Sequence, residues 1–108
     1  MRLLLSSLII VSLVGISSSS CSADIKVVNR PKCKYLLEGE IKQGDFEQLK
    51  ATGIKREDVL CLNSQGGNYG AGLDIADYLY NADIRTVVEN GHFCLSACAI
   101  IFGTYIHA

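Results

Sequence analysis

The fold of this chain is decided by two segments, VLCLNSQGG at 59–67 and CLSACAIIF at 94–102. The first begins with a short continuous apolar run, which is typical of a strand buried on both faces of a parallel sheet. Between the two segments, apolar residues recur every three or four positions, at Ala71, Ile75, Tyr78, Leu79 and Ala82. That spacing predicts an amphipathic helix over 71–82, and a β-branched run then predicts a strand over 84–88. The crossover of this strand, helix and strand unit should be right-handed.

The sequence on either side of this unit adds further elements. Residues 34–37 predict a strand that continues into a turn. A helix is predicted over 44–53, in which Asp45 and Gln48 have the spacing of a capping box. The apolar run at 97–102 predicts a last helix. The chain is therefore expected to have an α/β fold, as one domain or part of one.

Two turns at the carboxyl ends of the central strands carry the candidate chemistry. The carboxyl ends of parallel strands face one edge of the sheet, where ligands bind in such folds. Gly66-Gly67 lies at the first end, and without a Cβ it can turn a backbone N–H toward a substrate carbonyl. Ser96 follows the second, with the Ala97 N–H at the start of a helix. Each signal alone has an ordinary explanation: the glycine pair can be a flexible loop, and the serine can be a helix N-cap. Together they indicate the front half of an acyl-transfer site.

Several stretches, taken in order, have the pattern of a known family. They are LEGEI at 37–41, GD at 44–45, LNSQGG at 62–67, TVV at 86–88 and CLSACA at 94–99. This series resembles the core of the Clp protease proteolytic subunit and its secreted relatives, within the crotonase-like superfamily. The resemblance runs from about Leu36 to about Phe102. Gln65 stands where the family usually has proline.

The resemblance implies a function and a set of site residues. Ser96 would be the nucleophile of a serine peptidase, and the Gly67 and Ala97 N–H groups would form the oxyanion hole. Peptides or proteins would be the substrates, and no cofactor is expected. Relatives assemble into rings, which implies a homo-oligomer. The fold implied is a crotonase-like βαβ core.

The catalytic base is the part of the pattern that this sequence lacks. In the family a histidine and then an aspartate follow the serine much further along the chain. His107 is expected to be a solvated or chain-end residue, and His92, which precedes the serine, a loop residue. A serine hydroxyl is a poor nucleophile without a base. Residues 24–108 are therefore interpreted as the N-terminal part of such a domain, incomplete at its C-terminus.

Two other functions fit the same sequence. The first is a non-catalytic interaction module or pseudoenzyme that keeps the fold and lacks the base. The second is the acyl-coenzyme A chemistry of the same superfamily, which also uses paired N–H groups. Export disfavours the second, because the cofactor that it needs is large and cytoplasmic.

The first residues have the pattern of a signal peptide. A short basic start precedes an apolar run over 3–16, which has about the length of a secretory core rather than of a membrane span. Cleavage after Ala23 would remove residues 1–23 and leave Asp24 as the first residue of a periplasmic or secreted protein. The alternatives are an uncleaved anchor and lipidation at Cys21, which would attach the chain to a membrane.

Four cysteines follow the predicted leader: Cys33, Cys61, Cys94 and Cys98. An even number in an oxidising compartment indicates disulfides. Sequence alone allows three pairings, and Cys33–Cys61 with Cys94–Cys98 is preferred because the members of each pair fall close together in the expected layout. A zinc site built from His92, Cys94 and Cys98 would need a fourth ligand from elsewhere, so no metal is expected.

The charge balance bears on the partners. The chain has ten Lys and Arg against eleven Asp and Glu, and a formal net charge of −1. A near-neutral chain gives no reason to expect nucleic acid or an anionic membrane surface as a partner. Its core is also modest in size, so crosslinks should matter for its stability.

Overall fold

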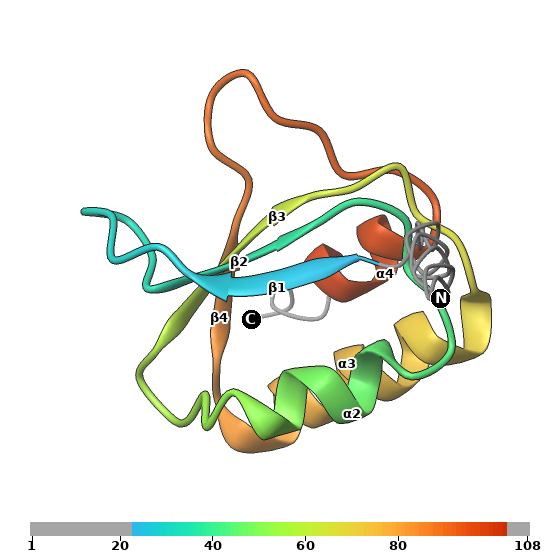
Figure 1. Ribbon diagram of the computed structural model, residues 1–108, viewed down its shortest axis with the longest axis horizontal. Helices are drawn as coiled ribbons and strands as arrows, with labels where there is room; N and C mark the ends of the chain where they lie inside the picture. The colour runs from blue at the N-terminus through green and yellow to red at the C-terminus, as the bar shows by residue number, and fades with distance from the viewer. Residues whose placement is uncertain (1–22, 104–108) are drawn as a thin grey trace, which may run out of the picture.

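The computed structural model describes residues 23–103, which form a four-stranded mixed sheet and three helices (Figure 1). The elements in chain order are β1 (Asp24–Val27), β2 (Tyr35–Glu38), α2 (Asp45–Ala51), β3 (Val59–Asn63), α3 (Tyr69–Ala82), β4 (Arg85–Val87) and α4 (Ala97–Gly103). The strands lie in the order β1-β2-β3-β4, with β1 antiparallel to β2 and the other neighbours parallel. The chain is therefore α/β, as predicted. Cys21, His107 and the predicted leader up to residue 22 lie outside the described residues.

One face of the sheet and the three helices enclose the main core. Side chains alternate along a strand, so Leu60 and Leu62 of β3 point to the same face as Leu37 of β2. They pack with helix residues that are also fully buried, namely Leu49, Ile75, Leu79 and Ile101. Burying a leucine or isoleucine side chain stabilises a fold by about 1.5–3 kcal/mol. The apolar spacing along 71–82 thus correctly predicts which side of α3 is buried.

The opposite face of the sheet holds a smaller core around a disulfide. Cys33 is bonded to Cys61 of β3, and Leu36 packs beside them. A turn over 28–34 lies next to this cluster, held by the hydrogen bonds from Val28 N–H and Asn29 N–H to Lys34 O. This face is covered by loops and a crosslink, whereas the helices lie on the other face (Figure 1).

The structure corrects the predicted elements in three places. Strand β1 was not predicted. The capping box of the helix over 44–53 is wrong: Gly44 is the N-cap, and no side-chain bond caps the helix. The buried Asp45 carboxylate instead accepts hydrogen bonds from the Lys42 N–H (2.7 Å) and the Ala23 N–H (3.4 Å). Helix α3 begins before residue 71, because the Asn68 side chain caps it by accepting from the Ala71 N–H (2.8 Å).

The two disulfides join the cysteines in the preferred pairing, Cys33–Cys61 and Cys94–Cys98. Both are compatible with an exported protein in an oxidising compartment. Within residues 23–103 no helix is both long and apolar enough to cross a bilayer.

The two disulfides should differ in their effect on global stability. Cys33 and Cys61 are separated by 28 positions and Cys94 and Cys98 by 4. Because the entropy removed from the unfolded chain grows with loop length, replacing the first pair with alanine should lower the free energy of unfolding by about 3.6 kcal/mol, and the second pair by about 2 kcal/mol. Urea denaturation of the two double variants measures this difference. An equal loss, or a larger loss for Cys94 and Cys98, would contradict the chain-entropy explanation.

Candidate active site

Ser96 lies at the junction between the loop after β4 and helix α4. Its side chain is exposed, and its backbone has φ +55°, in the left-handed region that costs an L-residue roughly 1–2 kcal/mol. A capping serine would accept a hydrogen bond from the second or third N–H of the helix. Here the Cys98 N–H donates to Leu95 O (2.9 Å) and the Ala99 N–H to the backbone oxygen of Ser96 (2.8 Å). The Ser96 hydroxyl is therefore left without a hydrogen-bond partner among residues 23–103, so its role as an ordinary side-chain cap is not supported.

The glycine turn packs directly against Ser96. Gly66 has φ +98°, and a Cβ at this position would lie 2.6 Å from both Leu95 O and the Ser96 Cβ. The same Cβ would lie 3.0 Å from the Ala97 nitrogen. Glycine is required here because a side chain would collide with the serine loop and fill the space beside the Ala97 N–H. The two turns that the sequence places at one edge of the sheet are thus in contact.

Gly67 is held in place by Ile41, the residue after the turn that follows β2. The Ile41 N–H donates to Gly66 O and the Asn68 N–H donates to Ile41 O, both at 2.8 Å. In a parallel bridge of this kind the central residue directs its own N–H away from its partner. In the described chain neither the Gly67 N–H nor the Ala97 N–H donates to an acceptor. Both N–H groups that the sequence pattern assigns to the oxyanion hole are therefore without an acceptor among residues 23–103; Gly67 is exposed, whereas Ala97 is buried.

A buried residue, Ser64, joins the two turns through its hydroxyl and its backbone. Ser64 is fully buried; its Oγ donates to Gly39 O (2.6 Å) and accepts from the Gly66 N–H (3.0 Å). Its backbone N–H donates to Phe93 O (2.8 Å), and its carbonyl accepts from the Leu95 N–H (2.9 Å). This role of Ser64 was not predicted from the sequence. The signal was present, because a serine that directly continues an apolar strand is buried and must find partners.

His92 does not lie at this site. It lines a hollow with Arg30, Lys32 and Glu89, and its backbone N–H donates to Glu89 O (3.0 Å). Its Nδ1 is buried and has no hydrogen-bond partner in the part of the chain that the structure describes. No hydrogen bond joins the His92 side chain to Ser96 in the structure of residues 23–103.

A separate polar cluster lies on the sheet face opposite to the helices. The Asn63 side-chain amide donates to Glu38 Oε2 (2.9 Å), and Lys26 Nζ lies 3.4 Å from Glu38 Oε1. The hydrogen bond from Asn63, with a smaller contribution from Lys26, lowers the pKa of Glu38 below its ordinary value, although burial opposes the shift. Glu38 is thus kept ionised and partnered, which suits a structural role better than that of a base.

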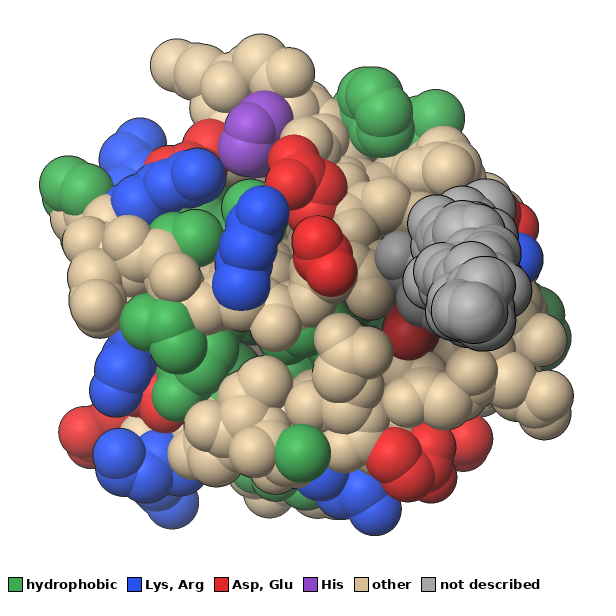
Figure 2. Space-filling model, viewed as in Figure 1, with side chains coloured by type: hydrophobic (Ala, Val, Ile, Leu, Met, Phe, Trp, Pro, Cys, Tyr) green, Lys and Arg blue, Asp and Glu red, His purple; other side chains and the backbone are tan. Residues whose placement is uncertain are grey.

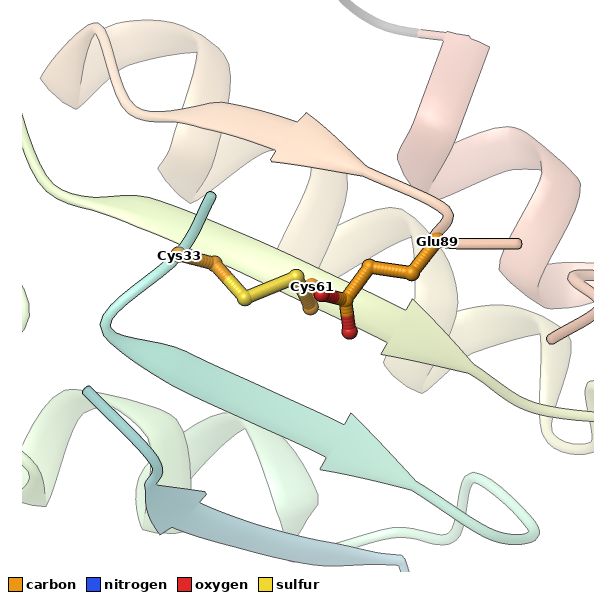
Figure 3. A group of neighbouring side chains, drawn as sticks. All are labelled: Cys33, Cys61 and Glu89. Atoms are coloured by element: carbon orange, nitrogen blue, oxygen red, sulfur yellow. A yellow bond between two sulfur atoms is a disulfide. The ribbon is translucent and has the colours of Figure 1, made fainter. Parts of the chain in front are cut away.

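Two groups of possible metal ligands are occupied by other bonds. The Glu89 carboxylate lies beside the Cys33–Cys61 disulfide (Figure 3), with the three ligand atoms within 4.8 Å of one another. The two sulfurs are bonded to each other, and Arg30 Nη1 lies 2.7 Å from Glu89 Oε1. The sulfurs of Cys94 and Cys98, which the zinc alternative needs as thiolates, are also joined in a disulfide.

The surface around the site is partly apolar. Figure 2 shows acidic and basic side chains interspersed on one face of the molecule, without a large region of one sign. Large apolar side chains are exposed on α3 and near Ser96, namely Tyr69, Leu73, Tyr80, Phe93, Leu95 and Phe102. Leu95, next to Ser96 in the chain, is 53% exposed.

In comparisons with known proteins, no family model, no curated protein and no solved structure matches this chain.

Replacing Ser64 with alanine should destabilise the protein by about 1–3 kcal/mol, because Gly39 O and the Gly66 N–H would lose their buried partner. Ser96→Ala is the matched control. It removes an exposed hydroxyl that has no partner within residues 23–103, and its effect should stay within about 0.5 kcal/mol. Urea denaturation of both variants measures the difference. Equal stability of the two variants would show that the Ser64 hydroxyl does not stabilise the link between Gly39 and the Gly66 turn.

The left-handed backbone of Ser96 predicts an unusual response to glycine. Ser96→Gly should be more stable than Ser96→Ala by roughly 0.5–1 kcal/mol, because glycine adopts positive φ without a steric penalty. At an ordinary helical position glycine is about 1 kcal/mol less stable than alanine. Thermal or urea unfolding of the pair decides, and a less stable glycine variant would exclude the left-handed conformation.

Proposed function

We propose that this chain is an exported serine peptidase of the Clp type, with a crotonase-like core, in which Ser96 attacks the carbonyl of a peptide bond. One observation carries the proposal: an exposed serine, held at positive φ, lies against the Gly66 turn and is followed by a free Ala97 N–H. A strained backbone of this kind is found at functional sites, where the surrounding structure maintains it. The unpartnered Gly67 N–H supports the same assignment.

The proposed reaction has two steps. In the first, the Ser96 oxygen bonds to the carbonyl carbon and its proton passes to a base, while the carbonyl oxygen becomes an oxyanion that accepts hydrogen bonds from the Gly67 and Ala97 N–H groups. The C–N bond then breaks, and the amine leaves with the proton from the base. In the second step, water attacks the acyl-enzyme in the same way and releases the acid.

The reaction needs a catalytic base, and residues 23–103 do not supply one. Within this range no imidazole or carboxylate contacts the Ser96 hydroxyl, and His92 lies in a different hollow. The resemblance to the Clp proteolytic subunit places a histidine and an aspartate further along the chain. The proposal therefore requires a base from outside the described residues.

A non-catalytic interaction module is the second candidate. It is favoured by the exposed apolar side chains on α3 and around Ser96, since aromatic and aliphatic side chains grouped at a surface are typical of protein contacts. In that case Ser96 would need no base, and its positive φ would only determine the shape of the loop.

A fluorophosphonate probe, which reacts with activated serines, separates the two candidates. Residues 24–108 alone should be labelled only at background level, because no base adjoins Ser96 among residues 23–103. When the segment that carries the family's histidine and aspartate is added, Ser96 should be labelled, and Ser96→Ala should lower kcat for peptide cleavage by roughly 10⁶. If the extended protein folds and is neither labelled nor active on a broad peptide library, the interaction module replaces the peptidase.

Gly67 is not suitable for testing the oxyanion hole. It has φ +143°, and a Cβ there would collide with the backbone of Ile41. Any side chain would therefore disturb the pairing of the turn as well as the N–H, and a loss of activity would not distinguish the two causes.

A further inference from the structure

The Cys94–Cys98 disulfide encloses the candidate nucleophile. The bond joins residues four positions apart with a Cα–Cα distance of 5.1 Å, and Leu95, Ser96 and Ala97 are the residues between them. Every backbone group assigned to the serine side of the site therefore belongs to this short ring.

The two ends of the ring are fixed to different parts of the fold. Cys94 forms a bridge with Ser64, whose backbone hydrogen bonds to Phe93 and Leu95 tie the segment to the end of β3. Cys98 is fully buried and belongs to the main core in α4, beside Ala97. The S–S bond thus connects the sheet side of the loop to the helix side across Ser96.

We propose that the Cys94–Cys98 disulfide is the positioning element of the nucleophile, which holds Ser96 in its left-handed conformation and keeps the Ala97 N–H facing the Gly66 turn. A left-handed serine has lower-energy alternatives in a flexible loop, and the ring excludes them. Because the ring is short, the bond removes less entropy from the unfolded chain than Cys33–Cys61 does, so what distinguishes it is its effect on local geometry. Its functional consequence rests on the proposed peptidase site; its structural claim does not.

The test compares two double variants, Cys94→Ala/Cys98→Ala and the matched control Cys33→Ala/Cys61→Ala, in the full chain. The first readout is structural: the φ angle of Ser96 from backbone couplings, and the hydrogen exchange of the backbone amides at positions 98 and 99, which close the turn. In the Cys94→Ala/Cys98→Ala variant Ser96 should leave the left-handed region, and both amides should exchange about tenfold faster by local opening. The control should keep both values of the wild type.

A second readout measures reactivity in the form of the protein that carries the base. Fluorophosphonate labelling of Ser96 should fall about tenfold in the Cys94→Ala/Cys98→Ala variant and stay unchanged in the control, although the control loses more unfolding free energy. If the Cys94–Cys98 bond only stabilised the fold, the control, which loses more unfolding free energy, would show the larger fall in labelling. If no form is ever labelled, the peptidase proposal fails, and the backbone readout still decides the positioning role.

Reduction provides the same test without a substitution at the site. In the Cys33→Ala/Cys61→Ala background, dithiothreitol transfers two electrons and two protons to the remaining S–S bond, giving thiols at Cys94 and Cys98, and is itself oxidised to a cyclic disulfide. Reduction should reproduce the change in φ and in amide exchange without replacing any side chain in the ring, in a protein that still folds without the Cys33–Cys61 bond. An unchanged Ser96 backbone after complete reduction would overturn the proposal.

Discussion

The arrangement of the site depends on the buried hydroxyl and peptide groups of Ser64. A polar group removed from water destabilises a fold unless it forms hydrogen bonds. Ser64 forms them with partners from three separate segments. Gly39 follows β2, Gly66 belongs to the turn after β3, and Phe93 and Leu95 belong to the loop after β4. One fully buried residue therefore fixes the relative positions of the glycine turn and the serine loop.

The rest of the site follows from that constraint together with steric ones. With the two loops fixed, only glycine fits at position 66, and the backbone of Ser96 is turned to positive φ. Disulfides support both faces of the sheet: Cys33–Cys61 replaces helix packing on the loop-covered face, and Cys94–Cys98 closes the serine loop. A small domain with a modest core benefits from crosslinks of both kinds.

Sequence patterns predicted much of this arrangement, and the misses have physical reasons. The apolar spacing along 71–82 and the continuous run at the start of 59–67 predict α3 and β3, because burial dictates the residue types there. Strand β1 was missed because its pattern is short and its residues are mostly exposed at the sheet edge. The capping-box prediction was wrong because the carboxylate of Asp45 bonds to Lys42 and Ala23 instead of capping α2. The bond to Ala23 is a tertiary contact, which local spacing does not predict. The hydrogen bonds of Ser64 depend on three loops meeting, which no single segment encodes.

The central claim is that the Gly67 and Ala97 N–H groups and the Ser96 hydroxyl form one oxyanion site. A peptide boronic acid tests it directly, because boron bonds to the serine oxygen and gives a tetrahedral anion while the hydroxyl proton passes to the buffer, and no leaving group has to depart. In a ¹⁵N-resolved NMR titration of residues 24–108, the amide protons of Gly67 and Ala97 should shift downfield together, and Ser96→Ala should abolish both shifts. Unchanged Gly67 and Ala97 signals at saturation, or the same shifts in Ser96→Ala, would contradict the account.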